Sequence, residues 1–338
     1  MHTVARTAPK SDVLVDIHDL RTYFPTEDGL VKAVDGVNLQ IHRQRTVGIV
    51  GESGCGKSVT ALNVMGLVPR PPAIIEGKIL FHQKDRVIDI LSLSPRGSEI
   101  RSIRGKEIAM IFQEPMTSLN PVYTIGNQIM ESITLHQGVS QEQARELAIQ
   151  LLDRVGIPVP ERRVDEYPHQ LSGGMRQRAM IAMALSCNPA LLIADEPTTA
   201  LDVTIQAQIL ELMQELQDEF ETAIMLITHD LGVVAEMADD VAVMYLGQIV
   251  EHAPKRDLFK KHYHPYTEGL LQSVPRFRSI REHRLQPIEG MVPDGRHLPS
   301  GCRFAPRCPY SVQQCNEEPP VFQPEPNHYV RCWRYKEA

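Results

Sequence analysis

Aromatic and excess basic side chains are both scarce in this sequence of 338 residues. Phe, Trp and Tyr make up 5% of the chain, and 35 basic residues stand against 42 acidic ones, which gives a net charge of −7. Proteins that bind nucleic acid broadly combine a positive surface with aromatic rings on which bases stack. The composition therefore argues against this class, and we expect no nucleic-acid partner.

Long apolar runs are also missing. The longest apolar stretch, residues 181–194, is interrupted by Ser186, Asn188 and Pro189, whereas a membrane-spanning helix needs about 18 or more apolar residues. The first twelve residues, MHTVARTAPKSD, lack the apolar segment of a secretory signal. We therefore expect a protein that does not cross the membrane and that resides in the cytoplasm, where cysteines are usually thiols or metal ligands.

Cysteine and proline are concentrated at the end of the chain. Residues 252–338 hold 12 of the 25 prolines and 4 of the 6 cysteines. A single hydrophobic core usually stops growing at about 250–300 residues, so the length suggests a main domain with an appendage. We predict a flexible N-terminal tail over residues 1–12, a main domain over 13–250 and a C-terminal extension over 251–338.

Strand and helix patterns alternate through the main domain. Short, nearly all-apolar runs such as residues 191–194 and 223–228 are typical of strands buried on both faces of a parallel sheet. Between residues 122 and 187 the apolar spacing is helical, which predicts a helical subdomain inserted into an α/β fold. Strands are predicted over residues 13–24, 31–41, 46–50, 108–112, 190–194, 223–228 and 240–246.

A glycine-rich motif follows the predicted strand TVGIV. Residues 51–58 read GESGCGKS and fit the pattern GxxxxGK[ST]. Glycines let the backbone wrap around phosphate oxygens, which its N–H groups and the positive end of the next helix then bind. We expect Lys57 to reach the β and γ phosphates of a nucleotide and the Ser58 hydroxyl to bind Mg²⁺. The predicted binding residues are Gly51, Glu52, Ser53, Gly54, Cys55, Gly56, Lys57 and Ser58.

Two carboxylates end the apolar strand predicted at 191–194. Taken alone, Asp195 and Glu196 are more typical of a helix cap or a surface turn. Coupled to a phosphate-binding loop, the pair predicts catalysis, with Asp195 holding Mg²⁺ and Glu196 acting as general base on the attacking water.

The segment 171–175 reads LSGGM and opens a predicted helix. Ser-Gly-Gly by itself is a good N-cap, but together with the two motifs above it closely resembles the LSGGQ signature of ABC-transporter ATPase domains. The resemblance implies a P-loop NTPase fold, with a RecA-like parallel sheet core, an antiparallel β subdomain and an inserted α-helical subdomain. It also implies that ATP held by an opposite subunit is bound by Leu171, Ser172, Gly173, Gly174 and Met175.

Further residues match landmarks of the same family. The resemblance implies that Gln113 contacts Mg²⁺ and water, that Asp202 lies in a loop at the dimer interface, and that His229 contacts the γ-phosphate. It assigns adenine stacking to Phe24, with the adjacent Tyr23 as the alternative.

Longer stretches, among them FQEPMTSLNPVYTIGNQI and VPDGRHLPSGCRFAPRCP, resemble ATPase subunits of dipeptide and oligopeptide importers. The resemblance implies a peripheral subunit on the cytoplasmic face of the membrane. Its implied partners are a second, different ATPase subunit, two transmembrane permease subunits and an external solute-binding protein. The same role in an oligosaccharide or nickel importer remains an alternative, and a soluble ABC ATPase that acts on nucleic acid is a more distant one.

Four cysteines, Cys302, Cys308, Cys315 and Cys332, lie in the proline-rich extension. Four thiolates in a loop-rich segment suit either tetrahedral zinc or an iron–sulfur cluster, and there is no C-x-x-C pair of the kind found in ordinary zinc ribbons. The resemblance implies a 4Fe–4S cluster at these positions. Zinc, two disulfides and free thiols remain as alternatives.

Overall fold

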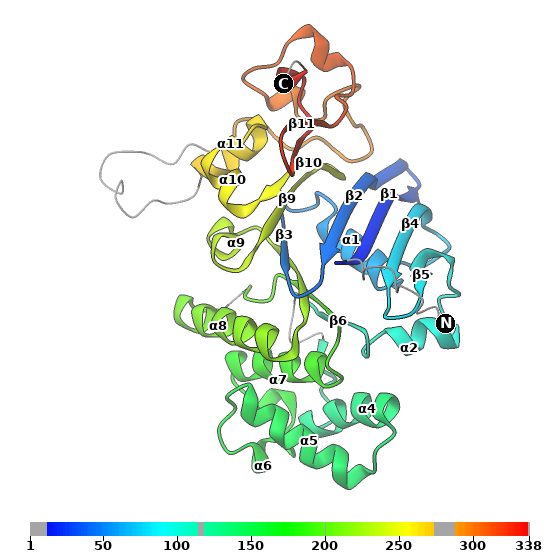
Figure 1. Ribbon diagram of the computed structural model, residues 1–338, viewed down its shortest axis with the longest axis vertical. Helices are drawn as coiled ribbons and strands as arrows, with labels where there is room; N and C mark the ends of the chain where they lie inside the picture. Colours follow the sequence, from blue (N-terminus) through cyan, green and yellow to red (C-terminus); the bar gives the residue numbers. More distant parts are fainter. Residues whose placement is uncertain (1–11, 114–117, 200, 274–287, 337–338) are drawn as a thin grey trace, which may run out of the picture.

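Strands of a parallel sheet form the centre of the molecule. The computed structural model describes residues 12–113, 118–199, 201–273 and 288–336 (Figure 1). Its larger sheet has the strand order β11-β12-β10-β9-β3-β8-β7-β6, in which pairing is parallel from β9 to β6. The parallel strands are β3 (Thr46–Val50), β6 (Ile108–Ile111), β7 (Leu191–Asp195), β8 (Ala223–Thr228) and β9 (Asp240–Tyr245).

The parallel sheet separates two hydrophobic cores. Because alternate side chains of a strand point to opposite faces, Leu192 and Ala194 of β7 enter one core while Leu191 and Ile193 enter the other. Every residue of β3, β7 and β8 is buried. These strands are therefore covered on both faces, as their unbroken apolar sequences predicted.

An antiparallel sheet covers one of these faces. It has the order β2-β1-β4-β5, and its apolar residues share a core with the first two helices. In Figure 1 its strands β1, β2, β4 and β5 lie side by side and run in colour from blue to cyan. The elements of this part are β1 (Val13–Thr26), β2 (Gly29–His42), α1 (Lys57–Val64), β4 (Ile74–His82), β5 (Val87–Asp89) and α2 (Ser98–Ile103).

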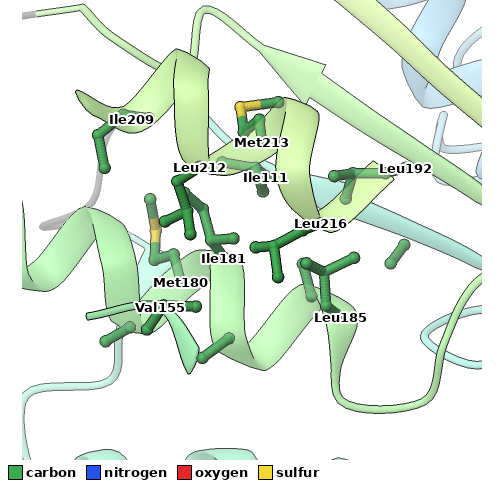
Figure 2. Close-up of a cluster of buried hydrophobic side chains, with 14 of the residues drawn as sticks. Ile111, Val155, Met180, Ile181, Leu185, Leu192, Ile209, Leu212, Met213 and Leu216 are labelled. Atoms are coloured by element: carbon green, nitrogen blue, oxygen red, sulfur yellow. The ribbon is translucent and has the colours of Figure 1, made fainter. Parts of the chain in front are cut away.

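Helices cover the other face of the parallel sheet. Figure 2 shows the contact between α7 and α8, in which Ile181 and Leu185 of α7 lie beside Leu212 and Leu216 of α8. Of the inserted helices, α5 begins with a capping box between Ser140 and Gln143. The helices on this side are α4 (Ile125–Gln137), α5 (Gln141–Arg154), α6 (Pro160–Arg163), α7 (Gly173–Leu185), α8 (Val203–Phe220) and α9 (Leu231–Met237).

The C-terminal extension continues the central sheet. Its strand β12 pairs with β10 in antiparallel fashion, with Glu251 opposite Val330, and β11 then pairs with β12. The boundary predicted at residue 250 therefore falls inside β10. The elements of this region are β10 (Gln248–Pro254), α10 (Lys255–Lys260), α11 (Pro265–Gln272), β11 (Phe322–Glu325) and β12 (His328–Val330), with three short 3₁₀ turns.

A buried carboxylate holds this extension together. Both Glu251 and His328 have fully buried side chains, and His328 Nε2 lies 2.8 Å from Glu251 Oε1. Glu251 also accepts hydrogen bonds from the backbone N–H groups of Tyr263 at 2.6 Å and His264 at 3.0 Å. Burial raises the pKa of Glu251, but these hydrogen bonds outweigh burial and leave the pKa below its ordinary value of 4.5.

The sequence predicted the α/β class correctly, and the seven strands that it predicted match β1, β2, β3, β6, β7, β8 and β9 within a few residues. The helical subdomain is confirmed, since the described residues between 122 and 187 contain helices and no strand. Five strands of the structure were not predicted: β4, β5, β10, β11 and β12. Residues 1–11 of the predicted tail lie outside the described residues.

Within the ranges that the structure describes, no helix is both long enough and apolar enough to cross a bilayer.

Replacing Glu251 tests the role of this buried carboxylate. Glu251→Ala leaves His328 and two backbone N–H groups without their acceptor, so we expect the free energy of unfolding to fall by about 3–5 kcal/mol. Because the pKa is lowered in the folded state, the stabilisation is full above the unfolded value of 4.5 and is lost as the pH falls through the folded value. Denaturant unfolding at neutral and acidic pH measures both effects.

Glu325→Ala is the matched control, because Glu325 pairs with Lys261 in the same extension but on its surface. Equal losses in the two variants, or a loss for Glu251→Ala that does not shrink in acid, would contradict this account.

Candidate functional site

The glycine-rich loop joins the carboxyl end of β3 to the start of α1. Its glycines are required by close approach of other backbone: a Cβ on Gly51 would lie 2.1 Å from Met244 O, and one on Gly56 would lie 2.2 Å from Ala33 O. Gly56 also has φ 106°, a conformation that side chains disfavour. The loop is thus pressed against β2 and β9, and only glycine fits at these two points.

Lys57 is buried and folds across the loop. Its Nζ donates hydrogen bonds to Gly51 O at 2.8 Å and to Glu52 O at 3.1 Å. The Lys57 ammonium group is therefore held by carbonyl oxygens of the loop that the sequence predicts to bind the phosphates of a nucleotide. Cys55 lies within the same loop, 3.9 Å from Lys57 Nζ, and burial raises the pKa of its thiol.

Ser58 and Asp195 bring two oxygen ligands together. The Ser58 hydroxyl donates to Asp195 Oδ1 at 3.1 Å, across 137 residues of sequence. Burial raises the pKa of the Asp195 carboxyl, although the Ser58 hydrogen bond and the Lys57 charge act in the opposite direction. A hydroxyl and a desolvated carboxylate are the kind of donor that Mg²⁺ prefers, so this pair fits the metal predicted from the sequence.

Glu196 receives contacts from three sides. Gln113 Nε2 donates to Glu196 Oε2 at 3.1 Å, Thr199 Oγ1 donates to the same oxygen at 2.9 Å, and His229 Nδ1 lies 3.4 Å from it. The backbone N–H of Glu196 donates to Ile227 O of β8 at 2.8 Å. The structure thus brings Gln113, Glu196 and His229 to one point at the carboxyl ends of β6, β7 and β8.

The backbone of Glu196 is strained. Its φ of 49° lies in the left-handed region, which residues other than glycine, asparagine and aspartate seldom occupy. Such conformations cost about 1–3 kcal/mol and concentrate at functional sites. The strained backbone supports the prediction that Glu196 is a functional residue.

Tyr23 and Phe24 differ in how free their rings are. The Tyr23 hydroxyl donates to Asp35 Oδ1 at 2.5 Å, and Lys32 Nζ lies 5.6 Å from the centre of its ring. Phe24, the next residue of β1, points to the opposite face of the strand and is half-buried. Only one of the two rings can face a bound base. Because Tyr23 already contacts Asp35 and Lys32, Phe24 is the better candidate for stacking on adenine.

The LSGGM segment lies apart from this cluster. Ser172 caps α7 by accepting a hydrogen bond from Met175 N at 3.3 Å, and Leu171 is buried while Ser172 and Gly173 are exposed. Gly174 packs against Ile205 of α8, and Asp202 caps α8 by accepting from Ile205 N at 3.0 Å. In Figure 1 α7 lies away from α1, the helix that follows the phosphate loop.

The four cysteines of the extension surround one cavity of about 250 Å³. Burial, with smaller contributions from the nearby thiols of Cys302 and Cys308, raises the pKa of the Cys332 thiol to about 11. Among the residues with defined placement, no group of three or more His, Cys, Asp or Glu side chains is arranged to hold a single metal ion. All six cysteines are free.

Comparison with known proteins identifies the family. The family model "ABC transporter" matches residues 34–199, and "Oligopeptide/dipeptide transporter, C-terminal region" matches residues 250–315. A probable peptide ABC transporter ATP-binding protein of Sinorhizobium fredii is 52% identical over 98% of this chain and 97% of its own length. The chain belongs to the ABC transporter ATP-binding family.

Further relatives and a solved structure show the same similarity to ABC transporter ATP-binding proteins. The oligopeptide transport ATP-binding protein AppD of Bacillus subtilis is 52% identical over 96% of this chain and 97% of its own length. Among solved structures, a dimeric ATP-binding cassette in a post-hydrolysis state bound to ADP and phosphate superposes with a TM-score of 0.62 and 29% identity, covering 72% of this chain and 99% of that chain.

Some contacts of the phosphate loop escaped the sequence analysis. The Tyr266 hydroxyl contacts Glu52 N at 2.8 Å, and Arg307 donates to both carboxylate oxygens of Glu52 at 2.7 and 3.1 Å. Thr199, which supports Glu196, was also missed. No local pattern signals these contacts, because Tyr266 and Arg307 lie 214 and 255 residues from Glu52.

We expect Phe24→Ala to weaken binding of a fluorescent ATP analogue by about 5- to 100-fold, because stacking of a base on an aromatic ring contributes about 1–3 kcal/mol. Phe24→Trp is the matched control, since it keeps a flat ring at the same position of β1. Equilibrium titration measures both affinities, and equal binding by the alanine and tryptophan variants would remove Phe24 from the site.

Proposed function

We propose that this chain is the ATP-hydrolysing subunit of an importer of dipeptides or oligopeptides. The observation that carries the proposal is the meeting of the phosphate loop, Asp195, Glu196 and His229 at the carboxyl ends of adjacent parallel strands. Relatives named as peptide and oligopeptide transport proteins match over nearly the full chain, and the extension matches the C-terminal region of such transporters.

The ATP site is assigned residue by residue. Phe24 stacks on adenine, and Gly51, Ser53, Gly54 and Gly56 present backbone N–H groups to the phosphates, toward which Lys57 brings its charge. Ser58 and Asp195, with the amide oxygen of Gln113, would hold Mg²⁺, and the ion would supply positive charge that offsets the charge of the phosphates.

We assign the role of general base to Glu196. Water attacks the γ-phosphorus: a bond forms from the water oxygen to phosphorus, and the bond from phosphorus to the oxygen bridging to the β-phosphate breaks, releasing ADP and phosphate. Glu196 accepts the proton that the water loses. His229, 3.4 Å from Glu196 Oε2, orients the carboxylate and contacts the γ-phosphate, and Gln113 and Thr199 fix the same oxygen.

The signature segment serves a second subunit. Ser172 and Gly173 are exposed at the start of α7, where N–H groups and the positive end of the helix suit an anion. We assign residues 171–175 to the γ-phosphate of ATP held by a second, different ATPase subunit, and Asp202 to the interface. Two transmembrane permeases and an external solute-binding protein complete the transporter, with this chain bound peripherally at the cytoplasmic face of the membrane.

We further propose a 4Fe–4S cluster, held by the thiolates of Cys302, Cys308, Cys315 and Cys332. All four line one cavity, and about 250 Å³ is far more space than a single ion fills. Burial disfavours the ionised thiols, and bound iron would reverse this by pairing with the thiolates. The cluster would order a segment that contains few regular elements. Zinc bound by the same cysteines is the alternative to the cluster.

Glu196→Gln tests the assignment of the base. We expect ATP binding to persist and single-turnover release of phosphate at this chain's own site to fall about 10²- to 10⁴-fold, because the amide cannot accept the proton. Glu219→Gln, on the exposed surface of α8 where Glu219 pairs with Arg154, is the control and should hydrolyse normally. Undiminished release in Glu196→Gln would overturn the assignment.

Anaerobic purification tests the cluster. We expect broad visible absorbance with about four irons and four sulfides per chain, lost in Cys308→Ser and kept in Cys187→Ser, because Cys187 lies outside the cavity. Stoichiometric zinc without iron would show that the alternative is correct.

A further inference from the structure

Residues of the extension contact the phosphate loop directly. Arg307 donates to both carboxylate oxygens of Glu52, the second residue of the loop, at 2.7 and 3.1 Å. The Tyr266 hydroxyl, from α11, lies 2.8 Å from Glu52 N. The extension therefore contacts both the side chain and the backbone of one loop residue.

The ion pair between Arg307 and Glu52 is well shielded. The Arg307 side chain is 4% exposed and that of Glu52 is 29% exposed, and Arg307 also donates to Glu289 O at 3.1 Å and to the Tyr245 hydroxyl at 3.3 Å. A bidentate arginine–carboxylate pair fixes direction as well as distance. A carboxylate in a loop assigned to a triphosphate would repel it, so Arg307 both neutralises Glu52 and holds it to one side.

Arg303 makes a second connection. It donates to Leu246 O and to Asp35, which accepts the Tyr23 hydroxyl at 2.5 Å. The turn after Leu246 is itself fixed to the phosphate loop, because Gly247 N donates to Cys55 O at 2.8 Å. Arg303 thus supports the other side of the loop, next to the strand that carries the adenine-stacking candidate.

Both arginines are sequence neighbours of the cavity cysteines. Arg303 follows Cys302 and Arg307 precedes Cys308. The segment between them is internally bonded, with Ala305 N donating to Cys302 O at 3.0 Å and Cys308 N to Ala305 O at 3.3 Å, and Cys302 N donates to Cys315 O at 2.9 Å. The position of each guanidinium therefore depends on the order of the four-cysteine segment.

We propose that Arg303 and Arg307 are positioning residues through which the four-cysteine segment holds the phosphate loop in its binding conformation and so sets the affinity of the ATP site. The proposal rests on the ATPase function proposed above. A merely structural attachment of the extension would leave nucleotide affinity unchanged, whereas a loop that is less often in its binding conformation raises the apparent Kd in proportion.

The test compares arginine variants of the full chain by titration with fluorescent MgADP. If the loop is competent about a tenth of the time without the ion pair, Arg307→Ala raises Kd about tenfold. The KM for ATP should rise in parallel while kcat at saturating ATP changes little, because bound nucleotide restores the loop. Arg307→Lys, which keeps the charge without the fork, should give an intermediate Kd.

Arg296→Ala is the matched control. Arg296 also joins the extension to the main domain, through Asp28 at 3.0 Å, but it is exposed and does not touch the loop, so its Kd should match the unmodified chain. Arg307→Gln replaces Arg307→Ala if the alanine variant fails to fold, because the amide keeps much of the side chain's length and some of its hydrogen bonding. The Kd for MgADP should again rise about tenfold.

The outcomes separate the two proposals. An unmodified chain that binds no MgADP would overturn the ATPase function itself. If the unmodified chain binds and hydrolyses nucleotide but the Arg307 variants bind equally well, or if Arg296→Ala weakens binding as much as they do, the positioning role alone is overturned.

Discussion

Parallel pairing of β3, β6, β7 and β8 is the constraint on which the rest of the molecule depends. Parallel strands in one sheet end at the same edge, so the segments that follow them meet there even when the sequence separates them widely. The phosphate loop follows β3, Glu196 follows β7, and His229 follows β8. The burial of these strands on both faces fixes their register, and with it the distances among the side chains of the candidate site.

Charge is concentrated at this edge at a cost that the surrounding contacts offset. Lys57 and Asp195 are buried, and Asp195 sits beside Glu196, whose backbone is strained. Isolated, these groups would destabilise the fold. The Ser58 hydroxyl, the loop carbonyls and the side chains around Glu196 satisfy them, which leaves a site already shaped for an anionic substrate and its cation.

How much of this was predictable varies with the distance over which residues interact. Apolar runs identified β3, β7 and β8, and the motif residues around Lys57 and Glu196 carried their own sequence signal. Strand β4 was missed because Gly77, at φ 98°, interrupts its alternation. The contacts of Arg307 with Glu52 could not be predicted, because they arise only once the extension has folded back over the sheet, and an arginine beside a cysteine has no pattern that indicates a partner 255 residues away.

The pairing of β12 with β10 also bears on how this chain could be shortened. A strand at the edge of a sheet exposes unpaired N–H and C=O groups that invite association with other chains. β12 covers that side of β10, and β11 in turn covers β12. A truncation just after β10 would therefore uncover a strand whose outer side is normally paired, and the shortened protein would tend to self-associate through that edge instead of persisting as an independent domain.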